Sequence, residues 1–380
     1  MKILIAGDFA PVYHRLKAKI INASYSDVLG EVHPIVSETD YSIVNFESPI
    51  ADPATDSPIK KNGPNISTPP NALDALKWCG FKMITLANNH IFDYGEAGVI
   101  NTLDYAKKTG IQTIGAGINL ADASRIKYIS IKDKKVALIN CCENEFSIAT
   151  ETTAGANPIN PIKQFYDIQT ARSNADRVIV IVHGGHEYCQ LPSIRMQDTY
   201  RFYIDAGADA VVNHHQHCYS GFEVYNGKPI FYGLGNFCFD KSNPYKLDLW
   251  TEGYMVILDF STNDTKFELL PYTQCNETPS VVLSKDKAAF LSRIEELNIT
   301  IQNRNQLKAA IEDYYASCSS TALEIFEPYR GRYLKSAFSR GLLPSFLKGS
   351  KILEVLNSIK CESHLDKLKY AIEHLNQQKR

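Results

Sequence analysis

Long apolar stretches are absent from this 380-residue sequence. None of its segments approaches the twenty or so apolar residues that a membrane-spanning helix needs. The apolar run near the N-terminus is only about four residues long, far shorter than the core of a signal peptide. We therefore expect a cytoplasmic protein with no membrane segment.

The sequence also lacks a large excess of either positive or negative charge. Forty Lys and Arg residues against forty-two Asp and Glu residues leave a formal charge of −2. The basic residues read as dispersed, whereas nucleic-acid binders cluster them on one face or along one helix. No run of acidic residues marks a disordered tail. We expect no nucleic-acid partner.

The nine cysteines include no Cys-x-x-Cys pair, and only Cys141 and Cys142 are adjacent. An odd number of scattered cysteines without a secretory signal is typical of reduced thiols rather than of a disulfide framework. Internal repeats and low-complexity tracts are missing as well. With 44% hydrophobic and 22% charged residues, the composition is that of a globular protein with a substantial core.

The first 270 or so residues alternate β-rich runs with helical stretches, which indicates an α/β fold. Several of these runs are apolar throughout, as expected for strands covered by helices on both faces. Helices are predicted at Asn71–Cys79 and Ala97–Thr109, each followed by a glycine that ends it. The predicted strands are Lys2–Gly7, Asp40–Asn45, Phe81–Leu86, Lys127–Ile131, Val136–Asn140, Arg177–His183 and Ala210–Asn213.

The pattern changes after residue 220. Phe222–Tyr225 and Pro229–Leu234 flank Asn226-Gly227, a sequence that favours a tight β-hairpin. Further strands are predicted at Tyr254–Phe260 and Lys266–Leu270, so antiparallel strands should join a parallel-rich sheet in a layered sandwich. From about Lys285 onward the chain reads as helical, with segments at Asp286–Leu297, Arg304–Ser317, Lys351–Ile359 and His364–Gln377. We expect one domain at residues 1–275 and a helical extension at 276–380.

Polar side chains with metal-binding chemistry follow the ends of the predicted strands. In open α/β sheets, ligands bind at these carboxyl ends because loops from several strands converge there. Asp8 closes the first strand; it could simply cap a turn, or it could offer a hard oxygen ligand to a divalent cation. Glu47, two residues after Asn45, could be solvated, or its two oxygens could bridge two cations.

Asn88, Asn89 and His90 follow the strand Phe81–Leu86 and cannot all belong to the core. Asn89 offers an amide oxygen to a metal, and His90 could donate a proton to a leaving group. Asp93 is placed to fix the tautomer of His90.

The most apolar strand ends in the run His183-Gly184-Gly185-His186-Glu187. Either this run is an ordinary glycine turn with solvated polar residues, or the glycines let the backbone approach a ligand. His183 is the better metal ligand, whereas His186 and Glu187 suit contacts with a substrate.

Three histidines in four residues follow Asn213 and give the strongest signal. In extended backbone His215 and His217 face the same way, which suits one metal or two adjacent ones, while His214 faces elsewhere. A core of three buried imidazoles would need a hydrogen-bond partner for each. Two carboxylates, an amide and several imidazoles together suit Mn, Fe, Zn or Co better than Mg or Ca.

Several blocks of residues within roughly residues 1–240 form a recognisable set. They are Gly7-Asp8, Asn45-Phe46-Glu47, Ala87-Asn88-Asn89-His90-Ile91-Phe92-Asp93-Tyr94-Gly95, Gly115-Ala116-Gly117, His183-Gly184-Gly185-His186-Glu187-Tyr188, His214-His215-Gln216-His217 and Asn226-Gly227-Lys228-Pro229-Ile230-Phe231-Tyr232-Gly233-Leu234-Gly235-Asn236-Phe237. Through these blocks the sequence resembles the capsule-synthesis CapA/poly-γ-glutamate family. The resemblance implies a branch of the calcineurin-like metallophosphoesterase superfamily, with a four-layer α/β/β/α sandwich and two metals at the strand ends.

The resemblance also implies roles for individual residues. The first metal would have Asp8 and His217 as ligands, Glu47 would bridge, and the second metal would have Asn89, His183 and His215. His90 would be the general acid, assisted by Asp93. Independently of the resemblance, we expect substrate contacts from five further residues of these strand ends, namely Asn45, Asn88, His186, Glu187 and His214. Ala10 departs from the superfamily, which has a histidine there, so the first metal loses one ligand.

These observations predict a metal-dependent hydrolase that uses two divalent cations, with a phosphoester as the bond cleaved. Its substrate would be an anionic small molecule or polymer, in capsule, poly-γ-glutamate or other cell-surface polymer metabolism. Two alternatives stay open: an amide hydrolase or transferase acting on a γ-glutamyl polymer, and a non-catalytic accessory subunit of a polymer-synthesis complex. In the last case the C-terminal helices would bind a protein partner.

Overall fold

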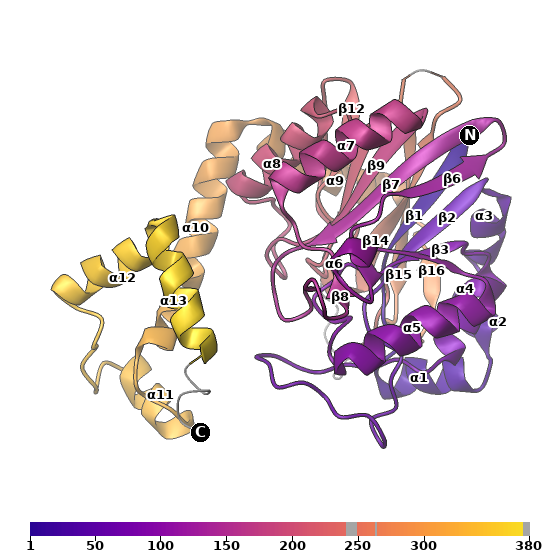
Figure 1. Cartoon of the computed structure of the whole chain (residues 1–380). Coiled ribbons are helices and arrows are strands. Elements are labelled where there is room, and N and C mark those ends of the chain that lie inside the picture. Colours follow the sequence, from indigo (N-terminus) through magenta and orange to yellow (C-terminus); the bar gives the residue numbers. More distant parts are fainter. Residues whose placement is uncertain (241–248, 263, 375–380) are drawn as a thin grey trace. The chain divides into compact units, whose positions relative to one another are not determined.

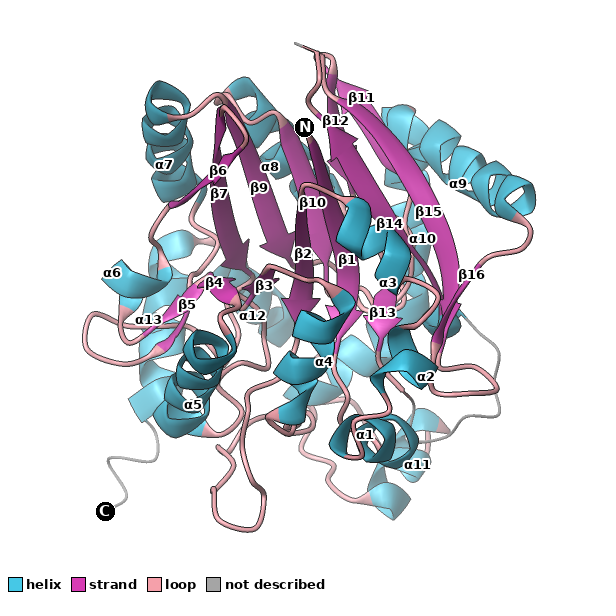
Figure 2. Ribbon diagram, turned by 90° about the vertical axis from the view of Figure 1, so that its right-hand side faces the viewer, coloured by secondary structure: helices cyan, strands magenta, loops and turns pink. Residues whose placement is uncertain are grey.

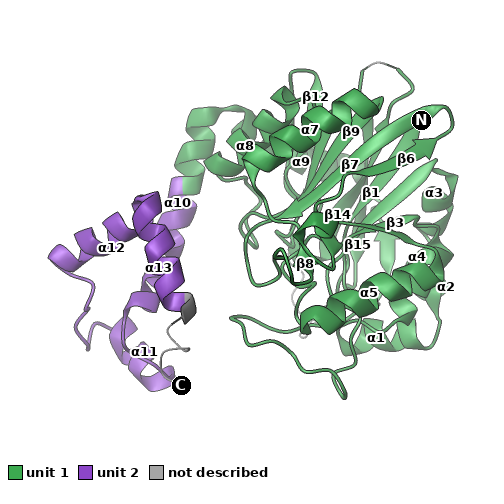
Figure 3. Cartoon of the chain, in the orientation of Figure 1, with its two compact units in different colours: residues 1–311 green, residues 312–380 purple. Residues whose placement is uncertain are grey.

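The computed structural model describes residues 1–240, 249–262 and 264–374. The chain forms two compact units, residues 1–311 and residues 312–380 (Figures 1 and 3). Helix α10 (Arg304–Leu323) runs across the boundary between them. The first unit contains every strand of the described chain.

The first sheet of this unit has eight strands, seven of them in the order β16-β15-β14-β1-β2-β3-β4. Strands β1 to β4 are parallel, and β13 lies parallel to the end of β1. The strands β14 to β16 continue the sheet in antiparallel fashion. The bounds are β1 (Lys2–Phe9), β2 (Tyr41–Phe46), β3 (Met83–Thr85), β4 (Gln112–Ile114), β13 (Asn236–Cys238), β14 (Glu252–Asp259), β15 (Lys266–Gln274) and β16 (Val281–Leu283).

The second sheet has six strands in the order β11-β12-β10-β9-β7-β6. Its centre is parallel, whereas β6 and β11 are antiparallel edges. The predicted hairpin is confirmed, because β11 and β12 pair around Asn226 and Gly227, both with the positive φ that a tight hairpin turn needs. The bounds are β6 (Lys127–Ile131), β7 (Lys134–Cys142), β9 (Arg177–His183), β10 (Ala210–His214), β11 (Phe222–Tyr225) and β12 (Lys228–Phe231). The short strands β5 (Ala116–Gly117) and β8 (Gly155–Ala156) pair with each other.

The two sheets pack face to face and helices cover their outer faces (Figure 2). Alternate residues of β1, such as Ile3 and Ile5, share a core cluster with Ile179 and Ile181 of β9, so this cluster lies between the sheets. The intervening Leu4 packs instead with the helices on the outer face of the first sheet. A third cluster joins the second sheet to its own helices. The predicted four-layer α/β/β/α sandwich is therefore confirmed.

The helices on the first sheet are α1 (His14–Ile21), α2 (Tyr25–Leu29), α3 (His33–Glu38), α4 (Asn71–Cys79) and α5 (Gly95–Thr109). Those on the second are α7 (Pro161–Asn174) and α8 (Ile194–Asp205), while the short α6 (Leu120–Ala123) lies beside β5 and β8. Helix α9 (Lys287–Gln302) closes one edge of the sandwich by packing on β11 and β15.

Helix α9 lies after the domain boundary expected at 275/276, yet it packs with the first unit. Its Phe290 and Ile294 are buried in the cluster between the two sheets. The compact first unit accordingly continues to Ile311. The boundary at 275/276 stays a prediction for the extent of the domain that the family resemblance implies.

The second unit is helical. Beyond α10 it contains α11 (Arg332–Ser339), α12 (Ser350–Lys360) and α13 (Glu362–His374), and α12 packs against α13. The predicted helix at His364–Gln377 continues into residues that lie outside the described chain. Across both units, no described helix is long and apolar enough to cross a membrane.

Candidate metal centre

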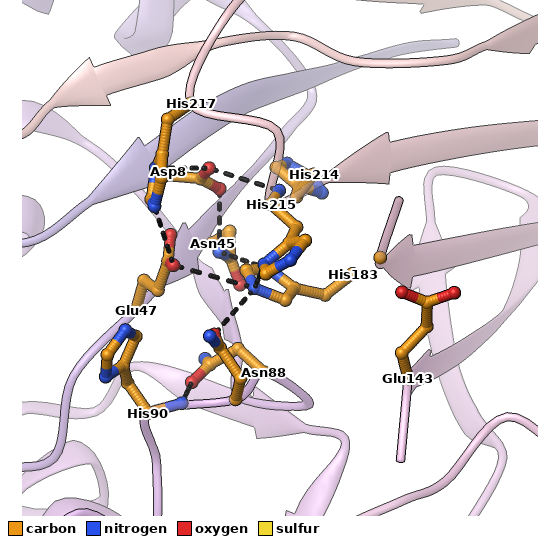
Figure 4. Close-up of polar contacts among 12 residues, drawn as sticks. Asp8, Asn45, Glu47, Asn88, His90, Glu143, His183, His214, His215 and His217 are labelled. Carbon is orange, nitrogen blue, oxygen red and sulfur yellow. Dashed lines mark hydrogen bonds and ion pairs between the residues drawn. The ribbon is translucent and has the colours of Figure 1, made fainter. Parts of the chain in front are cut away.

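The parallel strands of both sheets deliver their polar residues to one place. Asp8 lies near the end of β1, Glu47 directly after β2, Asn89 shortly after β3, and His183 at the end of β9. His215 and His217 follow β10. All six predicted ligands are at most 7% exposed, and Figure 4 shows the side chains of Asp8, Glu47, His183, His215 and His217 converging. The sequence prediction that these strand ends meet is confirmed.

Two groups of possible metal ligands share one carboxylate. Asp8, Glu47 and His217 form the first group, and Glu47, His183 and His215 form the second; within each group the ligand atoms lie within 4.8 Å of one another. Oε1 of Glu47 is 3.7 Å from Nε2 of His217 and 3.6 Å from Nε2 of His183 (Figure 4). Glu47 therefore stands where a ligand that bridges two cations would stand.

The Glu47 carboxylate is the least satisfied group in the cluster. It is fully buried, and neither oxygen has a hydrogen-bond partner among the described residues. Burial, and then the nearby charge of Asp8, raise its pKa well above the usual value. A buried anion without partners is costly, and bound cations would remove that cost. This orphaned carboxylate is the observation in the structure that fits a metal site.

The imidazoles of the cluster are held neutral. Burial lowers the pKa of His215 and of His217 to about 4, and it lowers that of His183 well below the usual value. Neutral imidazole is the form that binds a metal. At neutral pH, all three side chains can serve as ligands without first losing a proton.

Neighbouring amides orient several of these side chains. Nδ1 of His217 is 2.9 Å from Oδ1 of Asn236, so Nδ1–H donates to this oxygen and Nε2 is left for a metal. The Asn45 amide donates to Oδ1 of Asp8 at 2.7 Å. Asn236 had no role in the sequence analysis, although it lies in one of the blocks that carry the family resemblance.

The second group includes the predicted amide ligand. Oδ1 of Asn89 is 3.1 Å from Nε2 of His183, which in turn is 3.1 Å from Nδ1 of His215. The backbone carbonyl of Asn89 accepts a hydrogen bond from Ser147 at 2.5 Å. Three ligand atoms from three different strand ends thus lie around one point.

The backbone after β10 differs from the extended form that the sequence analysis assumed. His215 has φ of 96° and His217 has φ of 55°, so the expectation of an extended His215–His217 segment is wrong. Positive φ is strained for residues other than glycine, and such strain concentrates at functional sites. The two imidazoles still enter the same cluster, but a local backbone turn places them there rather than strand alternation.

His90 is oriented by an acidic partner, as predicted. Nδ1 of His90 is 2.7 Å from Oδ2 of Asp93, so Nδ1–H donates to the carboxylate and Nε2 is left for a substrate. The other carboxylate oxygen forms an ion pair with Lys61, whose side chain is only 4% exposed. The Lys61 ammonium is 3.2 Å from Nδ1 of His90. Lys61 was not predicted as a site residue, because it lies in a segment without a recognisable motif.

The segment that contains Lys61 is fastened to Asp93 at further points. The backbone N–H of Ile66 donates to Oδ2 of Asp93 at 2.8 Å, and that of Ile59 donates to the Asp93 carbonyl at 2.9 Å. Asp93 thus links residues 59–66 to the histidine that faces the pocket.

The residues predicted to contact substrate have different surroundings. Asn88 donates to the Phe46 carbonyl and accepts from the backbone N–H of His90. His214 is 2% exposed, and its Nε2 is 3.0 Å from the carbonyl oxygen of Ala6. These contacts, like those of Asn45, are with the protein.

His186 and Glu187 lie farther out along the same loop. His186 is half-buried, and burial lowers its pKa. Glu187 lines the pocket beside the cluster and is exposed. Substrate contact by these two residues stays a prediction.

The pocket beside the cluster has a volume of about 420 Å³. Asn89, His90 and His217 line it, and Lys61 and Trp250 also belong to its walls. The ring of Trp250 lies 4.6 Å from that of His217. The ligand cluster is therefore open to a small molecule or to the end of a polymer.

Ala10 lies on the aromatic side of this pocket. It is fully buried in a small apolar cluster with Ile66, Phe239 and Trp250. The family resemblance implies a histidine ligand at this position, and the chain instead has an alanine packed among apolar side chains. The first ligand group consequently consists of Asp8, Glu47 and His217.

The fold and the site together define an α/β/β/α sandwich protein with a buried oxygen and nitrogen ligand cluster at the strand ends. The model of the family described as bacterial capsule synthesis protein PGA_cap matches residues 2–241. The chain belongs to this family, as its resemblance to the CapA/poly-γ-glutamate family predicted.

Two Bacillus proteins support the same assignment. The chain is 35% identical over 232 residues to the capsule biosynthesis protein CapA of Bacillus anthracis, a match that covers 59% of this chain and 56% of that protein. It is 33% identical over 273 residues to the PGA biosynthesis protein CapA of Bacillus subtilis, covering 70% of each. The chain thus spans little more than half of the first relative. A solved structure of a hypothetical protein from Thermus thermophilus is similar over 72% of this chain and 99% of that one, with 13% identity and a TM-score of 0.46.

Proposed function

We propose that this protein is a metal-dependent hydrolase that cleaves a phosphoester at a site for two divalent cations, Mn, Fe, Zn or Co. The observation that carries the proposal is the sharing of Glu47 by two ligand groups, with both of its oxygens buried and without hydrogen bonds. Asp8 and His217 would hold the first cation, and Asn89, His183 and His215 the second. Bound there, the cations would supply positive charge for a phosphoryl group and lower the pKa of water.

The chain's own residues provide the proton for the leaving group. His90 donates Nδ1–H to Asp93, which leaves Nε2 to carry a proton to the leaving oxygen. Lys61 holds Asp93 from its other side and keeps this carboxylate in place. His90 is thus the general acid, and Asp93 and Lys61 are positioning residues.

The charges around the pocket make binding of an anionic substrate depend on the cations. Glu145 and Glu187 line the pocket, and Lys61 is already paired with Asp93. Without cations the pocket would therefore repel phosphate. We expect an anionic product analogue, such as inorganic phosphate, to bind only to the metal-loaded protein.

Hydrolysis of aryl phosphomonoesters and diesters by metal-stripped protein, with each cation added back, tests the proposal. We expect activity only with cation present. Asn89→Ala and His217→Ala should lower kcat/KM at least about 100-fold, because even residues that only orient a metal ligand matter by 10- to 100-fold. The control is His364→Ala, which changes an exposed histidine of the second unit. Equal activity of the wild type and the two ligand variants would refute the proposal.

The leaving group distinguishes the role of His90 from that of the ligands. A general acid contributes about 10²- to 10⁴-fold, and it matters most when the leaving oxygen is basic. His90→Asn should therefore lose far more activity on an alkyl phosphate than on a nitrophenyl phosphate. Equal losses on both substrates would show that His90 does not donate the proton to the leaving oxygen.

A second candidate keeps the site and changes the bond. The Bacillus subtilis relative is named a PGA biosynthesis protein, which favours an amide hydrolase or transferase acting on a γ-glutamyl polymer. Paired metal sites serve aminopeptidases as well as phosphatases. Release of glutamate from poly-γ-glutamate, without turnover of phosphoesters, would select this function. Bound metal without turnover of either substrate would select the accessory role.

A further inference from the structure

The second unit contains a segment that has basic residues and no acidic ones. Residues 328–353 include six Lys and Arg residues and no Asp or Glu, a formal charge of +6 in a chain whose formal charge is −2. The expectation that basic residues are dispersed is therefore wrong for this segment. The six are Arg330, Arg332, Lys335, Arg340, Lys348 and Lys351.

Large apolar side chains alternate with these cations and are exposed. Tyr333 is 90% exposed, Leu342 72%, Leu353 68% and Phe346 60%. None of the residues of α11 and α12 is buried. Exposed apolar groups gathered in one segment mark a surface that another body covers.

The segment is an ordered structure rather than a loose chain. The hydroxyl of Tyr329 donates to the Pro344 carbonyl at 2.6 Å, and its ring lies 5.2 Å from that of Phe338. Glu327, just before the segment, accepts from the backbone N–H of Phe346 at 2.9 Å. These contacts hold residues 344–347 against residues 327–329, just before α11.

Most of the cations have no acidic neighbour. Lys335 pairs with Glu324 at 3.3 Å and Lys351 with Glu354 at 3.2 Å, both at the surface. The remaining four have no ion pair within the described part of the chain. Their charge is available to a partner.

We propose that residues 328–353 bind the surface of an anionic lipid bilayer. Basic residues are drawn to anionic headgroups, and exposed Leu, Ile and aromatic side chains enter the boundary between headgroups and acyl chains. A nucleic acid would match the charge but would use aromatic rings for stacking, not aliphatic residues such as Leu342, Ile352 and Leu353. This surface is independent of the proposed hydrolytic function.

Flotation of the full chain with vesicles tests the proposal. One set contains phosphatidylcholine alone, and the other contains phosphatidylcholine mixed with phosphatidylglycerol. We expect binding to the mixed vesicles only, and weaker binding in high salt. Each basic residue contributes about 5-fold to binding at an anionic surface, so Arg332→Gln/Lys335→Gln/Arg340→Gln should weaken binding roughly 100-fold. Leu342→Ser/Leu353→Ser should abolish the binding that persists in high salt.

The matched control is Lys107→Gln/Lys108→Gln/Lys266→Gln, which removes the same charge from exposed positions of the first unit. This variant should bind the mixed vesicles like the wild type, and circular dichroism should show every variant folded. Failure of the wild type to bind mixed vesicles, or equal binding of the two triple variants, would overturn the proposal. Binding of single-stranded RNA without vesicle binding would overturn it in favour of a nucleic-acid surface.

Discussion

Replacing Glu47 by glutamine should stabilise the metal-free protein, which is the opposite of what removal of a buried side chain usually does. In the absence of cations, the buried Glu47 carboxylate must either stay charged without a partner or take up a proton. Protonating a carboxyl with an ordinary pKa of 4.5 costs about 3.4 kcal/mol at pH 7. Glutamine avoids this cost, so 3.4 kcal/mol is the upper limit of the gain.

The expected shift in melting temperature follows from the size of the first unit. At about 2.1 cal/mol/K per residue, its 311 residues give an unfolding entropy of about 0.65 kcal/mol/K. The gain at pH 7 is then at most about 5 °C, measured by calorimetry on protein stripped of metal with a chelator. Cation at about 100 times its Kd should instead stabilise the wild type by about 2.7 kcal/mol, or about 4 °C, and the variant by less.

The pH dependence has a definite sign. The pKa of Glu47 is raised in the folded protein, so the folded state binds more protons than the unfolded state above pH 4.5. The stability of the metal-free wild type therefore falls as pH rises from 4.5 towards the folded pKa, by about 1.4 kcal/mol per pH unit. The advantage of Glu47→Gln should therefore be larger at pH 7 than at pH 5.

Glu143→Gln is the matched control, since it is the same change at a carboxylate whose pKa is lowered rather than raised. Burial raises the pKa of Glu143, but the hydrogen bonds from Arg195 and from the Gly185 N–H outweigh burial and lower it overall. Glutamine there should leave stability unchanged or lower it. A metal-free Glu47→Gln protein that melts at or below the wild-type temperature at both pH values, with no effect of added cations on the wild type, would refute the reasoning.

Three further predictions concern other parts of the chain. Asp93→Asn should lower kcat by about 10²-fold or more, because it disturbs the general acid. It should change the metal content little, because Asp93 is not a ligand. Loss of metal from this variant, measured by mass spectrometry, would contradict the assignment. Phe290→Ala should lower the free energy of unfolding by about 3–5 kcal/mol in denaturant titrations, since α9 closes the core of the first unit. A loss below about 1 kcal/mol would show that α9 does not contribute to that core. Burial raises the pKa of the Cys79 thiol to about 12, and only Cys318 and Cys361 are not buried, so a thiol reagent should modify at most two of the nine cysteines rapidly before denaturation; rapid modification of more would contradict the packing.

Local patterns in the sequence predicted a large share of the fold. The bounds of β9 (Arg177–His183) and α4 (Asn71–Cys79) are those expected, because an apolar run and a glycine stop define them without long-range information. The parallel pairing of β13 with β1 was not predicted, since it pairs Asn236 with Asp8, two residues that are far apart in the sequence. Such a short strand carries no periodicity of its own.

The metal ligands could be predicted from the sequence because each of them lies at or just after the end of a predicted strand. The missing parts depend on non-local contacts or on backbone strain. Lys61 reaches Asp93 only because residues 59–66 fold back over it, and no motif marks that loop. Nothing in the sequence between His214 and His217 indicated the positive φ that turns the imidazoles into the cluster.

Anomalous diffraction from crystals soaked in Mn²⁺ or Zn²⁺ tests the shared carboxylate most directly. We expect two peaks about 3.5–4 Å apart, one between Asp8 and His217 and one among Asn89, His183 and His215, with Glu47 touching both. No peak at these strand ends, or peaks that leave Glu47 without a cation, would contradict the account.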